Sequence, residues 1–175
     1  MVEDHFINVY QTHAERIYRY CLFRTNSYQD AEDITAEVFV RFLENHDKIQ
    51  QDRILAWLFT VASNLCIDRY RKVARLGHSE EQFEAAQGHF NSPWEDEGVW
   101  QALRSLNPKQ QQVVYLKIVE DMSFKGVANF LGKKEGTVKM LFYRGIKGLR
   151  RILKEGNADV LLAQETRGGE AGSSN

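Results

Sequence analysis

The sequence predicts an all-α protein: two small helical domains joined by a flexible linker, the second of them containing a helix-turn-helix. Apolar residues recur at three- and four-residue intervals, which is the period of an amphipathic helix. Only 2 prolines in 175 residues leave long stretches free to be helical, and a 43% hydrophobic fraction can fill two cores. The pattern fades in two places, which predicts domains at residues 1–75 and 95–155, a linker at 76–94 and a disordered tail at 156–175.

The front half contains three expected helices. An apolar stripe over residues 5–24 predicts the first. A second helix should begin near Ser27, which heads a capping-box pattern, and end near His46, with its apolar stripe reaching Leu43. A polar loop follows, and a third stripe starts at Ile54 and turns basic at its end.

The back half contains four more expected helices. Ser92-Pro93 and Asn107-Pro108 are both start signals, a capping residue followed by proline at the first helical position. The helix opened by Pro108 should end near Asp121. Ser123 can cap a short helix, and a last helix should run from about residue 135 to residue 154.

Charge is distributed unevenly along the chain. Residues 99–155 carry 12 Lys/Arg against 4 Asp/Glu, whereas residues 76–98 carry none against 6. The first 75 residues are nearly balanced, with 10 against 11. A polyanion should therefore be gripped mainly by the back half, and the acidic middle fits a flexible connection.

The most specific motif is a helix-turn-helix between residues 124 and 141. Ala128 is small where two helices would cross, and Gly132 follows where the chain must turn with positive φ. Val138 and Leu141 would anchor the second helix, which in such motifs enters a DNA major groove. The alternative is a helical hairpin whose lysines are merely solvated. The candidate DNA-binding residues are Lys133, Lys134, Gly136, Thr137, Lys139, Met140, Tyr143, Arg144 and Lys147.

Three segments of the chain resemble the extracytoplasmic-function sigma factors of bacterial RNA polymerase. The run Leu106-Asn107-Pro108-Lys109-Gln110-Gln111-Gln112-Val113-Val114 precedes the helix-turn-helix, as in the C-terminal domain of that family. Residues 30–39 are similar to its acidic polymerase-binding helix, and residues 56–72 resemble its helix that engages the melted downstream promoter element. The resemblance implies a sigma-2-like domain in residues 1–75 and a sigma-4-like domain, which binds the upstream element, in residues 95–155.

The same resemblance implies roles for particular residues and partners. The acidic residues that would meet a basic coiled coil of the polymerase are Asp30, Glu32, Asp33 and Glu37. The residues that would engage the downstream element and its melted strand are Trp57, Asn64, Asp68, Arg71 and Lys72. The loop 46–51 would hold a flipped base. The implied partners are core RNA polymerase, promoter DNA as duplex and as melted strand, and an anti-sigma factor.

Two of these assignments have structural alternatives. Acidic residues in a first helical turn also favour the helix dipole, which explains Asp30 to Asp33 well and Glu37 poorly. Trp57 also lies on the apolar stripe of its helix and could belong to the core.

The chain departs from the family pattern at three positions. Many members have arginine at the position of Leu141, serine at Met140 and glutamate at Gly126. Losing the arginine removes an expected DNA contact, so the resemblance does not imply the promoter sequence. A glycine such as Gly126 inside a short helix costs about 1 kcal/mol relative to alanine.

No residues of the sequence point to catalysis. A phosphate-binding glycine loop, a metal-ligand cluster and a nucleophile triad are all missing, so we expect no enzyme, no metal and no cofactor. Cys21 and Cys66 are expected to be ordinary buried thiols. The absence of an apolar run of about 18 residues and of a signal core predicts a cytoplasmic protein with no membrane insertion of its own.

Two rival functions remain open at this point. One is a stand-alone helix-turn-helix transcriptional regulator with a helical sensor domain, and the other is a helical partner-binding protein with no DNA role. A regulator would bind duplex DNA alone, whereas a sigma factor would need core polymerase to do so.

Overall fold

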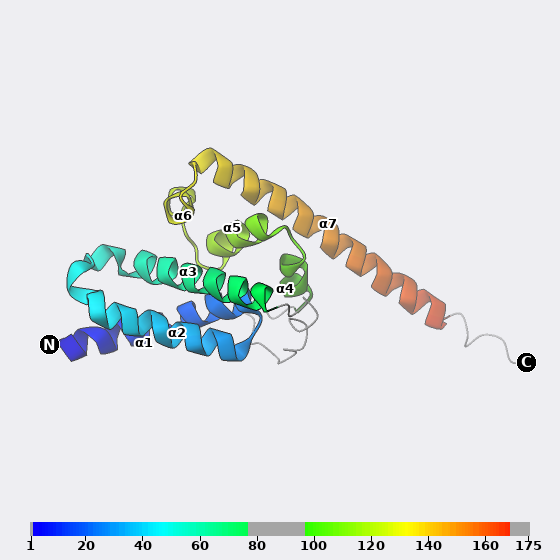
Figure 1. The fold of residues 1–175 in the computed structure, drawn as a ribbon. Helices are drawn as coiled ribbons and strands as arrows, with labels where there is room; N and C mark the ends of the chain where they lie inside the picture. Colours follow the sequence, from blue (N-terminus) through cyan, green and yellow to red (C-terminus); the bar gives the residue numbers. More distant parts are fainter. Residues whose placement is uncertain (1, 77–96, 169–175) are drawn as a thin grey trace, which may run out of the picture. The chain divides into compact units, whose positions relative to one another are not determined.

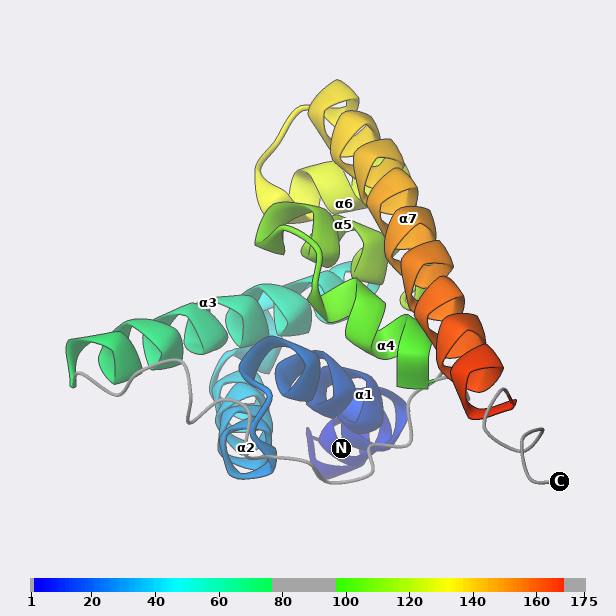
Figure 2. The same ribbon diagram turned by 90° about the vertical axis from the view of Figure 1, so that its right-hand side faces the viewer.

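The structure is a computed structural model that describes residues 2–76 and 97–168 (Figures 1 and 2). Within these ranges the chain forms seven α-helices and two short 3₁₀ helices, which confirms the predicted all-α class. The chain divides into two compact units, Met1–His89 and Phe90–Asn175. The acidic linker and the Ser92-Pro93 start signal fall outside the described residues.

The front unit consists of three helices, each of which packs against the other two. These are α1 (Val2–Thr25), α2 (Tyr28–Asn45) and α3 (Ile54–Arg75). The largest side chains of their shared core are Ile17, Tyr20, Phe42, Leu58 and Phe59, all fully buried. The rings of Tyr20 and Phe59 meet edge to face with centroids 5.3 Å apart, which joins α1 to α3.

A tight turn joins α1 to α2. Asn26 has φ 53°, a left-handed conformation that asparagine tolerates better than most residues. The Thr25 hydroxyl donates to the Cys21 carbonyl at 2.8 Å, and the Ser27 hydroxyl accepts from the Asp30 backbone N–H at 3.2 Å. Ser27 is therefore the N-cap that the sequence predicts.

The back unit consists of four helices: α4 (Glu97–Arg104), α5 (Pro108–Ile118), α6 (Phe124–Leu131) and α7 (Glu135–Gly168). The three shorter helices all lie along one side of α7 (Figure 2). The side chains completely removed from solvent are Leu103, Val113, Val114, Tyr115, Leu116, Val127 and Val138. This second core is separate from that of the front unit.

The predicted start signals of this unit are confirmed where they are described. The side chain of Asn107 caps α5 by accepting from the Lys109 N–H at 3.1 Å. Ser123 caps α6 by accepting from the Gly126 N–H at 3.0 Å. A Cβ on Gly126 would lie 3.2 Å from that same hydroxyl oxygen, a tight contact. Ser27 caps α2 in the same way with Asp30 at the equivalent position, so this contact does not account for the glycine.

Two expected helix ends are wrong. Helix α5 ends at Ile118 rather than near Asp121. Helix α7 continues to Gly168 instead of ending near Lys154, so most of the expected disordered tail is helical. The segment 157–168 contains no proline and several good helix formers, and the Gly- and Ser-rich composition begins only at its end. Residues 169–175 lie outside the described part of the chain.

Two glycines bring α7 unusually close to its neighbours. A Cβ on Gly145 would lie 2.6 Å from the Val114 Cγ2 atom, and one on Gly148 would lie 2.9 Å from the Leu106 Cδ2 atom. Neither distance leaves room for a methyl group. At Gly145 a larger residue would press on Val114 and on Gln110 of α5, whereas at Gly148 the Leu106 side chain would have to move. The sequence analysis missed this role, because a glycine inside a helical pattern normally only weakens the helix.

We predict that Gly145→Ala destabilises the back unit by about 1–2 kcal/mol, because overpacking outweighs the gain in helix propensity. Gly156→Ala is the matched control on the same helix, since nothing lies within 4 Å of a Cβ there. That variant should be unchanged or up to ~1 kcal/mol more stable. Chemical denaturation of the full chain measures both, and a Gly145→Ala variant as stable as the control would contradict the close approach.

Candidate nucleic-acid interface

Helices α6 and α7 form the helix-turn-helix. Gly132 between them has φ 61°, the left-handed conformation expected of a glycine that ends a helix. The Lys133 backbone N–H donates to the Ala128 carbonyl at 2.9 Å and closes the turn. Ala128 and Val138 are buried where the helices pack. The motif predicted from the sequence is therefore confirmed.

One face of α7 points away from the core. Val138 and Gly145 are buried on the inner side, and Leu141 and Phe142 are half-buried beside them. The candidate residues that are exposed are Lys133, Lys134, Gly136, Lys139, Met140, Tyr143, Arg144 and Lys147. Only Thr137 among the candidates is half-buried. The expected orientation of this helix is thus correct, whereas the DNA contacts themselves stay a prediction.

A cluster of aromatic and basic side chains covers the side of α7 that faces α6. The Phe124 ring lies edge to face with that of Phe142, with centroids 5.3 Å apart. Lys117 Nζ lies 5.1 Å and Lys139 Nζ 5.8 Å from the Phe124 centroid, within the range of cation–π attraction. Lys139 also pairs with Glu135 at 2.9 Å. Sequence analysis found neither Lys117 nor Phe124, because only the fold brings α5, α6 and α7 together here.

In the front unit, the acidic positions of α2 divide into two kinds. Asp30 pairs with Arg69 of α3 at 2.9 Å, and its side chain is only 22% exposed. Glu32, Asp33 and Glu37 are exposed on the outer surface of α2. Asp30 therefore links two helices of the unit, a role that the sequence did not anticipate because Arg69 lies 39 residues further along the chain.

Apolar side chains lie beside these exposed carboxylates. Val40 is 51% and Leu43 46% exposed on α2. Phe42 is buried on the predicted apolar stripe, but the expectation that the stripe reaches Leu43 is wrong, because Leu43 points outward. The outer face of α2 thus combines negative charge with accessible apolar surface, which is a composition that suits a protein partner.

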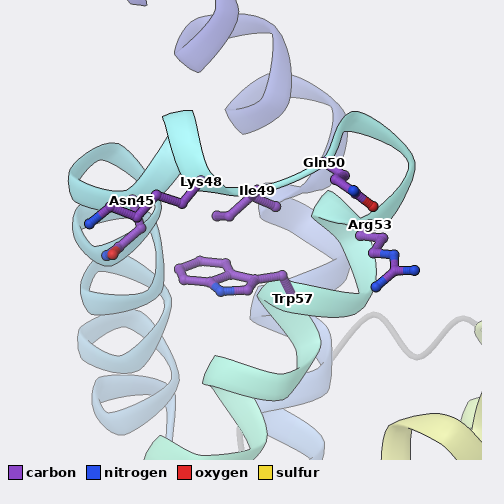
Figure 3. A pocket seen from close by; sticks show the side chains of 6 residues that line it. All are labelled: Asn45, Lys48, Ile49, Gln50, Arg53 and Trp57. Carbon is purple, nitrogen blue, oxygen red and sulfur yellow. The ribbon is translucent and has the colours of Figure 1, made fainter.

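A pocket lies where the chain passes from α2 to α3 (Figure 3). The connection folds into two 3₁₀ turns, His46–Lys48 and Gln51–Arg53, instead of an irregular loop. The pocket has a volume of about 390 Å³ and is lined by Asn45, Lys48, Ile49, Gln50, Arg53 and Trp57. The resemblance pointed to the loop 46–51, whereas Asn45 and Arg53 were missed.

Trp57 forms the floor of this pocket. Figure 3 shows its indole lying flat beneath the loop with Ile49 above it. The indole also contacts the tilted ring of Phe42, with ring centroids 6.2 Å apart. Trp57 is half-buried, so it contributes to the core and to the pocket at once. A flat aromatic face bordered by an amide and by the cations of Lys48 and Arg53 suits a planar base attached to a phosphate.

The remaining candidates of α3 continue from this pocket along one side of the helix. Asn64 and Asp68 follow Trp57 by seven and eleven residues, which at ~100° per residue keeps all three on one face. The exposed candidates are Asn64, Asp68, Arg71 and Lys72. Asp68 and Arg71 are 3.9 Å apart and highly exposed, so this pair holds neither side chain firmly.

The two cysteines are buried and free, as expected. They are not isolated from each other, however, because the fold brings α1 and α3 together at these positions. A hydrogen bond from the Cys21 thiol lowers the pKa of Cys66, and the same contact together with burial raises the pKa of Cys21. Within the described ranges no three His, Cys, Asp or Glu residues gather as metal ligands would. None of the helices described is both long and apolar enough to span a bilayer.

Comparison with protein families gives two matches. Sigma-70 region 2 matches residues 9–76, and sigma-70 region 4 matches residues 96–149. The pocket and the acidic face of α2 lie within the first match, and the helix-turn-helix lies within the second.

Individual relatives agree with these matches. The chain is 32% identical over 162 residues to the ECF RNA polymerase sigma factor BldN of Streptomyces coelicolor, covering 87% of this chain and 61% of BldN. It is 27% identical over 170 residues to the ECF RNA polymerase sigma factor SigW of Bacillus subtilis, covering 87% of this chain and 91% of SigW. The chain thus spans about three fifths of BldN, and the same 61% of SigE of Mycolicibacterium smegmatis.

Solved structures show the same fold. The sigma factor RpoE in complex with the anti-sigma factor NepR from Bartonella quintana matches with a TM-score of 0.72 at 19% identity, covering 86% of this chain and 97% of that one. CnrH in complex with the cytosolic domain of CnrY matches with a TM-score of 0.65 at 21% identity, covering 87% and 90%.

We predict that Arg69→Ala lowers the free energy of unfolding of the front unit by about 0.5–1 kcal/mol, because the partly buried Asp30 loses its partner. Arg71→Ala is the matched control, since its 3.9 Å pair with Asp68 is exposed. The control should change stability by less than about 0.3 kcal/mol. Equal effects of the two substitutions in urea denaturation would show that Arg69 does not join α2 to α3.

Proposed function

We propose that this chain, which belongs to the extracytoplasmic-function sigma factors, binds core RNA polymerase and directs it to specific promoters. The observation that carries the proposal is the order of two different units in one chain. A region 2 unit, which has a pocket at Trp57 and an acidic face on α2, is followed by a region 4 unit with a basic helix-turn-helix. A stand-alone helix-turn-helix regulator would not need a region 2 unit to bind its operator. The chain would act by binding alone, without chemistry of its own.

The back unit would hold the upstream promoter element as duplex. The turn before α7 exposes Lys133 and Lys134, and the helix itself exposes Arg144 and Lys147. These four cations can neutralise phosphates and release their counterions. The N-terminal part of the helix would enter the major groove, because residues there reach base edges in such motifs. Phosphate contacts fix the register of the helix, and base contacts select the sequence.

The front unit would capture the opened downstream element. A base turned out of the duplex would stack on the indole of Trp57, while Lys48 or Arg53 holds the attached phosphate. Asn64, Asp68, Arg71 and Lys72 would follow the strand along α3. Capture stabilises the melted state relative to the duplex, so binding energy rather than hydrolysis would favour promoter opening.

The outer face of α2 would dock on the polymerase. Glu32, Asp33 and Glu37 supply the negative charge that steers a basic coiled coil of the enzyme into place. Val40 and Leu43, both exposed, would add the apolar area that charge alone does not provide. Asp30 would contribute indirectly by fixing α2 against α3 through Arg69.

Regulation and location follow from the same proposal. The RpoE and CnrH structures were solved as complexes, the first with the anti-sigma factor NepR. By analogy an anti-sigma factor would hold this chain inactive until a signal releases it. Core polymerase and promoters are in the cytoplasm, and the chain would work there.

The direct test is transcription from a genomic DNA pool by core polymerase of the source bacterium, with and without the purified chain. We expect a set of start sites that appear only with the chain and share two sequence elements upstream. No new start sites would contradict the proposal. Tight, sequence-specific binding of the chain alone to duplex DNA would instead favour the stand-alone regulator.

We predict that Trp57→Ala weakens formation of the open complex by about 1–3 kcal/mol, because one base loses its stacking surface. Trp57→Phe should retain most of the effect, since it keeps an aromatic face. Tyr70→Ala is the control, because Tyr70 is an exposed aromatic on α3 outside the pocket. Permanganate reactivity of unpaired thymines measures opening. Undiminished opening by the alanine variant would rule out base capture at this pocket.

We predict that the double charge reversal Asp33→Lys, Glu37→Lys weakens binding to core polymerase at least tenfold, an effect that added salt should reduce. Helix content should change little, because both carboxylates are exposed and their ion pairs, Glu37 with Arg41 and Asp33 with Arg69, lie at the surface. The control reverses Glu15, which is exposed on α1. Unchanged affinity of the α2 variant would exclude this face as the docking surface.

A further inference from the structure

The outer face of α7 includes an apolar residue, Met140. Successive helical residues advance by ~100°, so Met140 stands about 200° from the fully buried Val138, on the opposite side of the helix. Its side chain is 42% exposed. Gly136, Tyr143 and Lys147 fall on the same outer stripe at four- and three-residue spacing. Met140 is therefore the central side chain of the surface that α7 offers to DNA.

The start of this stripe is free of both bulk and charge. Gly136 has no side chain, and a Cβ there would meet nothing within 4 Å, so the first turn of α7 is open. Tyr143, 63% exposed, lies on the other side of Met140. The charged side chains of the outer face, Arg144 and Lys147, come one to two turns later. The part of the helix that reaches deepest into a groove thus presents a thioether and a phenol.

Lys139, one of the candidate DNA-binding residues, also lies near the start of α7 but does not take the central place. Its ammonium pairs with Glu135 at 2.9 Å and lies 5.8 Å from the centroid of Phe124. The pair with Glu135 runs along α7 itself, and the contact with Phe124 places the ammonium beside α6, at the side of the DNA-facing surface. From this position the Lys139 ammonium can reach a phosphate, whereas Met140 would lie in the middle of the groove.

The chemistry of methionine restricts what it can recognise. A thioether donates no hydrogen bond and accepts only weakly, so it cannot read the polar edges of guanine, cytosine or adenine. The one apolar group that a base pair displays in the major groove is the C5 methyl of thymine. Methionine is flexible and polarizable, which lets it fit closely around such a group.

We propose that Met140 sets promoter preference by packing against a thymine methyl group at the centre of the upstream element. The inference rests on the proposed function, because it needs α7 to lie in the major groove of promoter DNA. The inference predicts a feature of the promoter sequence. At least one A·T pair must lie in the middle of the upstream element, oriented so that the thymine methyl group faces α7.

Replacement of thymine by deoxyuridine tests this contact, because only the methyl group is lost while base pairing is kept. The probe is a promoter identified by the start sites of the wild-type holoenzyme, with each upstream thymine replaced in turn. Wild-type holoenzyme should bind one such promoter about threefold to fivefold more weakly, the effect of one buried methyl group. Met140→Ala should bind the thymine and uracil promoters equally, whereas Met140→Leu should retain a preference for thymine.

Lys147→Ala is the matched control on the same outer stripe. It should weaken binding to both promoters by the same factor and reduce the salt dependence, as loss of a phosphate contact does. An upstream element without thymine, a wild-type holoenzyme indifferent to every replacement, or an unchanged thymine preference in Met140→Ala would each overturn the proposal. In all three cases specific transcription would continue, so failure here is distinct from failure of the sigma-factor assignment, in which no specific start sites appear.

Discussion

The close approach of α7 to the helices beneath it decides which side chains the back unit can offer to DNA. Gly145 allows the backbone of α7 to come against Val114, and Gly148 allows the same at Leu106. With Val138 buried on the same side, these contacts fix the rotation of α7 about its own axis. A rotation of one residue, ~100°, would bring Lys139 to the outer surface and hide Met140. If α7 binds DNA as proposed, its specificity would be set partly by residues that never touch the DNA.

In the front unit, too, contacts between helices determine which surfaces are presented to partners. Arg69 links α2 to α3 through Asp30, and the ring of Phe42 packs against the indole of Trp57. These buried and half-buried contacts hold two surfaces in place at once, the acidic outer face of α2 and the pocket between α2 and α3. Polymerase docking and capture of a base would then depend on one rigid three-helix unit, whose core is independent of the back unit.

The sequence was most informative where the signal is local. The caps at Ser27, Asn107 and Ser123 and the left-handed Gly132 are determined by residues a few positions apart, and the structure has all four as predicted. Helical periodicity also predicted the outer face of α7 correctly, because burial of Val138 determines which of the other residues of the helix point outward. The end of α7 was misjudged because Gly156-Asn157 is a typical helix stop signal, yet no proline follows it and the helix continues to Gly168.

Features that need distant residues could not be derived in this way. The Asp30–Arg69 pair, the neighbouring Cys21 and Cys66, and the cluster around Phe124 join helices far apart in the chain. A periodic pattern shows which residues turn inward but not which of them meet. The pocket at Trp57 was anticipated only through the family resemblance, because its shape depends on two 3₁₀ turns with no strong sequence signal.

The central claim is that one chain reads duplex DNA with its back unit and melted DNA with its front unit. Photocrosslinking in a complex of holoenzyme and promoter measures this directly, with a benzophenone amino acid in place of Tyr143 in one variant and of Trp57 in another. The first variant should crosslink to the upstream duplex element, and the second to a single-stranded segment near the start site. Crosslinks of both variants to the same segment, or of the Trp57 variant to duplex DNA alone, would contradict the division of labour between the two units.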